Sequence, residues 1–124
     1  MTGFIVFGHG SRVESANQAV RDVASRMAET GGYVTEPAFL ELGRPGLSGA
    51  VDRLAERGVT RIVVLPYFLT LGTHLQRDLP VLVEEAAHRH HDLSICIAPP
   101  LDGHPGLVQA LLDRADAALA GESR

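Results

Sequence analysis

Short apolar runs alternate with amphipathic helical patterns along the whole chain, and this alternation restricts the fold more than any other feature. Four runs have the length and composition of buried strands: Phe4–Phe7, Tyr33–Leu42, Arg61–Pro66 and Leu93–Ala98. A helical pattern follows each run, at about residues 14–29, 47–57, 78–90 and from 104–105 onward. Connections of this length between consecutive strands indicate a parallel sheet. We therefore predict an α/β fold in which a four-stranded parallel sheet is flanked by helices on both faces.

The order of the strands decides which loops meet at the sheet edge. A flavodoxin-like order, 2-1-3-4, is expected, and it creates a crevice at the carboxyl ends of the first and third strands. Pro37 lacks a backbone donor, so the second strand is expected at a sheet edge or a bulge. The 124 residues are enough for one domain, which we predict to span residues 1–124.

Local signals predict further details of the helices and of the last strand. Asp78 suits the N-cap of the third helix, and Pro80 then falls in its first turn. Cys96 is predicted to be a small buried residue of the fourth strand. The helix that opens at Pro105 has an apolar stripe, predicted to face inward, of Leu107, Val108, Leu111, Leu112, Ala115 and Leu119.

The composition excludes several classes of protein. A formal net charge of −4 argues against general binding to nucleic acid. No run of about eighteen apolar residues is present, so no membrane span is predicted. The single cysteine excludes an internal disulfide, and the absence of lysine excludes a Schiff-base or Walker lysine. The chain enters a strand without a preceding basic region, so we expect no signal peptide and a cytoplasmic location.

The first strand ends in Gly8-His9-Gly10, which presents a histidine at the mouth of the predicted crevice. The two glycines leave no side chain over the imidazole and permit unusual backbone angles. His74 follows the third strand and Glu41 closes the second, so all three side chains are expected to converge. Two imidazoles and a carboxylate suit a divalent first-row metal, and they leave coordination positions open. Neutral imidazole is also a base near pH 7.

Each of the three loops also carries an arginine, namely Arg12, Arg44 and Arg77. Guanidinium groups at the mouth would suit a ligand that bears carboxylates. Ser11 is a nucleophile in principle, but no acid is evident that would orient His9 as its base. We therefore assign Ser11 to the turn and to contact with the substrate.

Four motifs, ordered and spread over nearly the whole chain, together carry a family resemblance. They are Gly8-His9-Gly10-Ser11-Arg12, Ala38–Leu42 followed by Pro45, Pro66–His74 followed by Asp78-Leu79-Pro80, and Ala98–Pro105. Each motif alone is a weak signal, but the set is specific. On this basis the chain resembles the small sirohydrochlorin chelatases, the class II chelatases for cobalt or iron.

The resemblance implies a chelatase-like fold and insertion of a divalent metal into sirohydrochlorin, in cobalamin or siroheme biosynthesis. It implies that His9 and His74 bind the metal or accept pyrrole protons, that Glu41 assists, and that Ser11 and the three arginines contact the substrate. The metal is then a substrate, cobalt or iron with nickel also compatible, and no organic cofactor is expected. Short family members pair as homodimers, so we expect a homodimer; the alternative is that this chain is one half of a longer polypeptide.

Other functions fit parts of the sequence. A histidine phosphatase has an arginine before His-Gly, where Gly8 stands here, and a nucleotide or flavin module has a third glycine where Val13 stands. A non-catalytic metal or tetrapyrrole carrier with the same histidines and glutamate is the main alternative. The cluster of His88, His90 and His91 is interpreted as an exposed cap at a helix C-terminus, where cations are favoured, and not as a metal-delivery site.

Overall fold

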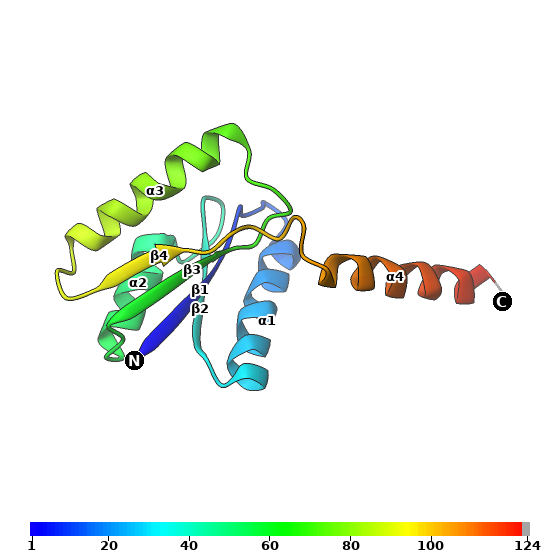
Figure 1. The fold of residues 1–124 in the computed structure, drawn as a ribbon, viewed down its shortest axis with the longest axis horizontal. Coiled ribbons are helices and arrows are strands. Elements are labelled where there is room, and N and C mark those ends of the chain that lie inside the picture. The colour runs from blue at the N-terminus through cyan, green and yellow to red at the C-terminus, as the bar shows by residue number, and fades with distance from the viewer. Residues whose placement is uncertain (123–124) are drawn as a thin grey trace.

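The computed structural model describes residues 1–122, which form four consecutive strand–helix units (Figure 1). The elements follow in the order β1 (Thr2–Gly8), α1 (Glu14–Gly31), β2 (Val34–Phe39), α2 (Leu47–Glu56), β3 (Arg61–Pro66), α3 (Thr73–His88), β4 (Ser94–Ile97) and α4 (Gly106–Glu122). All strand pairs are parallel, and the strand order is β2-β1-β3-β4. The predicted α/β class and strand order are thus confirmed. None of the helices described within residues 1–122 is long and apolar enough to span a membrane.

The register of the central strands brings three loops to one edge of the sheet. Gly8 pairs with Phe39 of β2, and Phe7 pairs with Pro66 of β3. Strands that pair in this way end together, so the loops after β1, β2 and β3 leave the sheet side by side. β2 lies at the edge of the sheet, as Pro37 predicted.

One face of the sheet is fully packed against α2 and α3. Residues of the central strands alternate between the two faces, and Phe7 and Ile62 point to this side with no exposed surface. Leu54 of α2 and Leu79 of α3 are buried against the same face. Burial of each such side chain stabilises the fold by about 1.5–3 kcal/mol.

The other face is covered by α1 alone, and only over β1 and β2. Val20 and Ala24 of α1 pack on Val6 and Phe39. α4 does not complete this layer, because it projects away from the sheet (Figure 1).

The predicted inward face of α4 and the predicted burial of Cys96 in β4 are therefore wrong. Val108, Leu111 and Leu112 are 54–70% exposed, and Cys96 is also exposed. The reason lies in the preceding connection, which is hydrogen-bonded along the loop after β3 and carries the chain past the sheet. An apolar stripe predicts that a helix will bury one face, but it does not identify the surface that covers it.

α3 begins five residues earlier than predicted, at Thr73, with Gly72 as its N-cap. Asp78 is consequently not a cap, and Pro80 lies inside the helix, where it removes one hydrogen bond. The longer helix buries Leu75 as well as Leu79, one turn apart on the same face. Burial of this leucine offsets the missing hydrogen bond, and the first turn of α3 now carries His74.

Candidate functional site

The glycine loop after β1 is fixed against the loop after β2. The amide of Leu40 donates to the carbonyl of Gly8 (2.9 Å), and the amide of Glu41 donates to the carbonyl of His9 (3.1 Å). Gly10 has a φ of 94°, and a β-carbon there would collide with the carbonyl oxygen of Glu41. Both the backbone angle and the close approach therefore require glycine. This contact places His9 and Glu41 on neighbouring backbones.

The side chains of His9 and Glu41 lie together but remain open to solvent. His9 Nε2 is 4.0 Å from Glu41 Oε1, and both side chains are more than half exposed. His9 Nδ1 lies 3.2 Å from the carbonyl oxygen of Gly10. A carbonyl only accepts, so Nδ1 carries the hydrogen and Nε2 of the neutral ring has the free lone pair. That lone pair is available to a metal or to a proton.

The side chain of Asn17, on α1, holds the loops after β1 and β2 together, and the sequence analysis did not predict this role. Its Oδ1 accepts from the amide of Ser11 (2.8 Å), while its Nδ2 donates to the carbonyls of Ser11 (2.9 Å) and Leu42 (2.8 Å). Asn17 is 1% exposed, so these bonds form without competition from water. An amide on the apolar side of α1, in line with Val20 and Ala24, was the available signal.

His74 projects from the first turn of α3 toward the same mouth. Arg77, one turn later, places a guanidinium nitrogen 3.3 Å from His74 Nδ1, and its Nε lies 3.9 Å from Asp78 Oδ1. Arginine only donates, so Nδ1 of His74 is the acceptor in this contact. A metal that binds at Nδ1 must therefore displace Arg77. All three side chains are exposed, so such a displacement meets little resistance.

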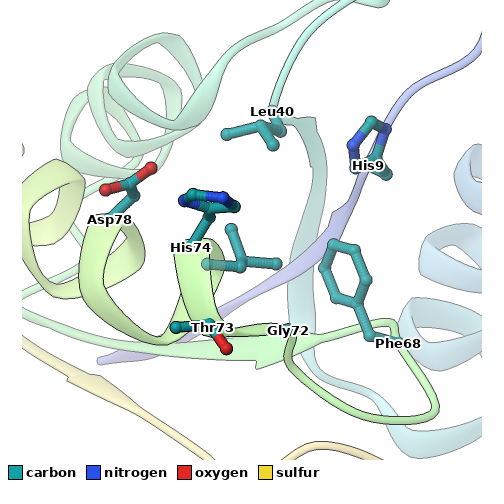
Figure 2. A pocket seen from close by; sticks show the side chains of 8 residues that line it. His9, Leu40, Phe68, Gly72, Thr73, His74 and Asp78 are labelled. Carbon is teal, nitrogen blue, oxygen red and sulfur yellow. The ribbon is translucent and has the colours of Figure 1, made fainter.

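His9 and His74 line one cavity of about 290 Å³. Figure 2 shows both imidazoles at this cavity, with Leu40 and Phe68 near them and Asp78 beyond His74. The ring of Phe68 meets that of His9 edge-on, with 6.5 Å between centroids. The cavity volume is at the lower limit of small-molecule sites, about 300–1,000 Å³. A larger ligand must extend over the rim.

The other predicted site residues lie around this cavity and not inside it. The hydroxyl of Ser11 accepts from the amide of Val13 (3.0 Å), which fits its predicted place in the turn. Arg12 is exposed on the loop after β1. Arg44 lines a neighbouring hollow, and its carbonyl accepts from Arg21 (3.3 Å).

A preformed three-ligand metal site is not found. Within residues 1–122, no three His, Cys, Asp or Glu side chains lie close enough to hold one metal ion. His9 and Glu41 form a pair, and His74 stands across the cavity from them. His9 and His74 thus line one cavity, and Glu41 lies beside His9 but is not among the residues that line it.

The histidine cluster lies at the opposite end of α3. From His74 to His88 the helix rises about 21 Å, at 1.5 Å per residue. His90 Nε2 and an Arg89 nitrogen each lie 2.7 Å from a different oxygen of Asp52 on α2. The hydrogen bond from His90, assisted by that from Arg89, holds the pKa of Asp52 below its ordinary value. His90 thus links two helices.

Comparison with known proteins gives the same assignment over nearly the whole chain. The CbiX family model matches residues 3–118. The chain is 34% identical to a protein of Methanopyrus kandleri named sirohydrochlorin cobaltochelatase, covering 98% of this chain and 100% of the relative. It is also 34% identical to the chloroplastic sirohydrochlorin ferrochelatase of Arabidopsis thaliana, covering 90% of this chain and 50% of the relative.

A solved structure agrees with the fold. The sirohydrochlorin chelatase SirB of Bacillus subtilis, crystallised with cobalt, superimposes with a TM-score of 0.85 at 27% identity. The match covers 94% of this chain and 50% of SirB. This chain therefore spans half the length of SirB and of the plant relative, and the full length of the Methanopyrus relative. From its motifs, fold and matched length, the chain belongs to the CbiX family.

Proposed function

We propose that this chain inserts a divalent metal, cobalt or iron, into sirohydrochlorin, as a step of cobalamin or siroheme biosynthesis. The observation that carries the proposal is the pair of exposed imidazoles, His9 and His74, on one cavity with apolar walls. Relatives named for both metals, a cobaltochelatase and a ferrochelatase, support the choice of metals. The metal is a substrate of this reaction, so an open site that releases it is required.

Insertion exchanges one metal ion for two pyrrole protons, and the residues at the mouth suit both halves of the exchange. His9 offers a free lone pair at Nε2 that can take a proton, and the Glu41 carboxylate lies 4.0 Å away. Solvent screens this pair, so the proton passes on to water without a large barrier. We assign His9 and Glu41 to metal binding and proton removal.

His74 is the second proposed ligand, and Arg77 controls its availability. Sirohydrochlorin carries many carboxylates, and a carboxylate that engages Arg77 draws the guanidinium away from His74 Nδ1. Substrate binding then frees the lone pair that the metal needs. Arg12 and Arg44 are exposed and take part in none of the ion pairs found within residues 1–122, so they are available for further carboxylates.

We further propose that the active species is a homodimer. The cavity of one copy is small for a macrocycle, and one copy holds no three-residue metal site within residues 1–122. SirB has twice the length of this chain, so two copies of this chain together have about the length of one SirB chain. Light scattering of the active protein measures this directly, and an active monomer would contradict it.

A cytoplasmic location also stays a prediction, to be checked by fractionation.

Turnover distinguishes a chelatase from a carrier with the same site. Sirohydrochlorin in large excess over protein is incubated with Co²⁺, Fe²⁺ or Ni²⁺ while the absorption spectrum is followed. We expect multiple turnovers with cobalt or iron, well above the rate without protein. A spectral change that stops at one equivalent of protein would identify a carrier, and no acceleration with any of the metals would contradict the proposal.

A further inference from the structure

Leu42, the residue directly after Glu41, has a backbone conformation that leucine rarely adopts. Its φ is 55°, and among residues 1–122 it is the one residue other than glycine with a positive φ. The β-carbon of an L-amino acid crowds the backbone in this region, so mainly glycine, asparagine and aspartate adopt it. A leucine at this position therefore costs folding free energy that an asparagine or a glycine would avoid.

Contacts of neighbouring groups hold this conformation, and they do not involve the Leu42 side chain. The carbonyl of Leu42 accepts from Nδ2 of the buried Asn17 (2.8 Å). The next residue, Gly43, approaches Phe39 so closely that a β-carbon there would lie 2.9 Å from the ring. Leu42 itself is 52% exposed, so its side chain adds little to the core. A strained residue with an exposed apolar side chain, next to a candidate site, indicates a role in binding.

Leu42 lies between the His9–Glu41 pair and a second hollow at the mouth. This hollow, of about 520 Å³, is lined by Glu14, Arg21, Leu42, Gly43 and Arg44. Leu42 is its one apolar side chain. Glu14 pairs with Arg21, whereas Arg44 takes part in none of the ion pairs found among the described residues. The hollow therefore offers a ligand one apolar contact and one available cation.

We propose that Leu42 is a substrate-contact residue, whose side chain lies against the apolar face of the sirohydrochlorin ring. The ring is too large for the 290 Å³ cavity and must extend over the rim, where Leu42 follows Glu41. A carboxylate at the edge of the ring then reaches Arg44 across the hollow. The contact rests on the proposed function and adds to it a residue that determines specificity for a flat, carboxylate-bearing ring.

Two substitutions separate the side chain of Leu42 from its backbone. Leu42→Asn removes the apolar surface and favours the observed φ, whereas Leu42→Met keeps an apolar side chain of similar size. Tyr33→Asn is the control, because Tyr33 precedes β2 at the opposite end of the strand and is 51% exposed. Sirohydrochlorin is titrated into each full-length protein without metal, and its change in absorption gives the Kd. Thermal melts and light scattering accompany each titration.

We expect Leu42→Asn to raise the Kd about three- to tenfold, the effect of losing about half the burial of a leucine side chain. It should melt at or above the temperature of the unmodified protein, and Leu42→Met and Tyr33→Asn should keep the original Kd. An unchanged Kd in Leu42→Asn would overturn the contact, as would an equal rise in Tyr33→Asn. A Kd that rises only because Leu42→Asn changes the oligomeric state would assign Leu42 to a protein contact instead.

The titration also separates this contact from the proposed function. Unmodified protein that binds sirohydrochlorin through Leu42 but shows no turnover would refute the chelatase and support the contact. Unmodified protein that does not bind sirohydrochlorin would overturn both.

Discussion

Histidines occur at both ends of α3, but their burial and their polar contacts differ. At the C-terminal end, His90 is half-buried and lies 2.7 Å from an Asp52 oxygen that Arg89 also helps to hold in place. At the N-terminal end, His74 is exposed, and its nearest polar contact is the long one to Arg77 (3.3 Å). The comparison teaches that histidine number is a poor guide to function. An exposed ring beside a cavity, held only by a long contact, is available for chemistry, whereas a half-buried ring bonded closely to a carboxylate stabilises the fold.

The largest expected effect is the loss of either imidazole at the mouth. We predict that His9→Ala and His74→Ala each lower the rate of metal insertion by about 100-fold or more, since one general base contributes about 10²–10⁴-fold. Both side chains are exposed, so the melting temperature should change little. Initial rates and thermal melts check this, and a variant that melts normally yet keeps most of its activity would remove that histidine from the site.

The next largest effect on activity is expected for Asn17, because its side chain holds the loops at the mouth of the cavity without touching the substrate. Asn17→Ala leaves the amide of Ser11 and two carbonyls without their partner, which we expect to cost about 1–3 kcal/mol of unfolding free energy. The His9 and Glu41 loops should then move relative to each other, and kcat should fall about tenfold with KM less affected.

Gln18→Ala is the control for Asn17, since it removes an exposed amide at the next position of α1. Chemical denaturation and steady-state kinetics should show no comparable loss for this variant. Equal behaviour of the two variants would mean that the buried clamp has no special role in the site.

Substitution of Arg77 should have a smaller effect, and it should change the KM values for sirohydrochlorin and for the metal in opposite directions. We predict that Arg77→Ala raises KM for sirohydrochlorin about three- to tenfold, because a charge-assisted contact to a carboxylate is lost. KM for the metal should fall, because no guanidinium competes for His74 Nδ1. Arg57→Ala, at the end of α2, is the control. If both KM values moved in the same direction, the proposed competition would be wrong.

Substitution of Asp52, which contacts the C-terminal end of α3, should have the smallest effect, and only on the free energy of unfolding. The carboxyl is partly exposed, so Asp52→Asn should cost at most about 1 kcal/mol and leave the insertion rate unchanged. Its pKa is lowered by the hydrogen bond from His90, so the stabilisation is present at neutral pH and is lost as the pH falls below about 4, the ordinary aspartate range. Denaturation of both proteins should converge at low pH; a constant difference would contradict this cause.

The sequence predicted the parts of the molecule that local pattern determines. Continuous apolar runs and helical stripes gave the strands, the class and the order of the sheet, and that order brought the loops of His9, Glu41 and His74 to one edge. The start of α3 was wrong because Asp78 and Pro80 are strong local signals, and only the tertiary burial of Leu75 outweighs them.

Two other features depend on contacts that a pattern does not contain. In the sequence, Asn17 is one polar residue among others on α1. Its role depends on a hydrogen bond to the carbonyl of Leu42, which lies on a distant loop. The stripe of α4 was recognised, but it was wrongly predicted to face inward, because the bonds of Leu101 and Asp102 that direct the helix away join distant segments.

The central claim is that the chemistry takes place at the N-terminal end of α3 and not at the histidine cluster. The most direct measurement compares initial insertion rates of His74→Ala and of a combined His88→Ala, His90→Ala, His91→Ala variant, at saturating and at limiting metal. We predict that the triple variant keeps the activity of the unmodified protein under both conditions, while His74→Ala loses most of it. A triple variant as inactive as His74→Ala at saturating metal, with an unchanged thermal melt, would contradict the account.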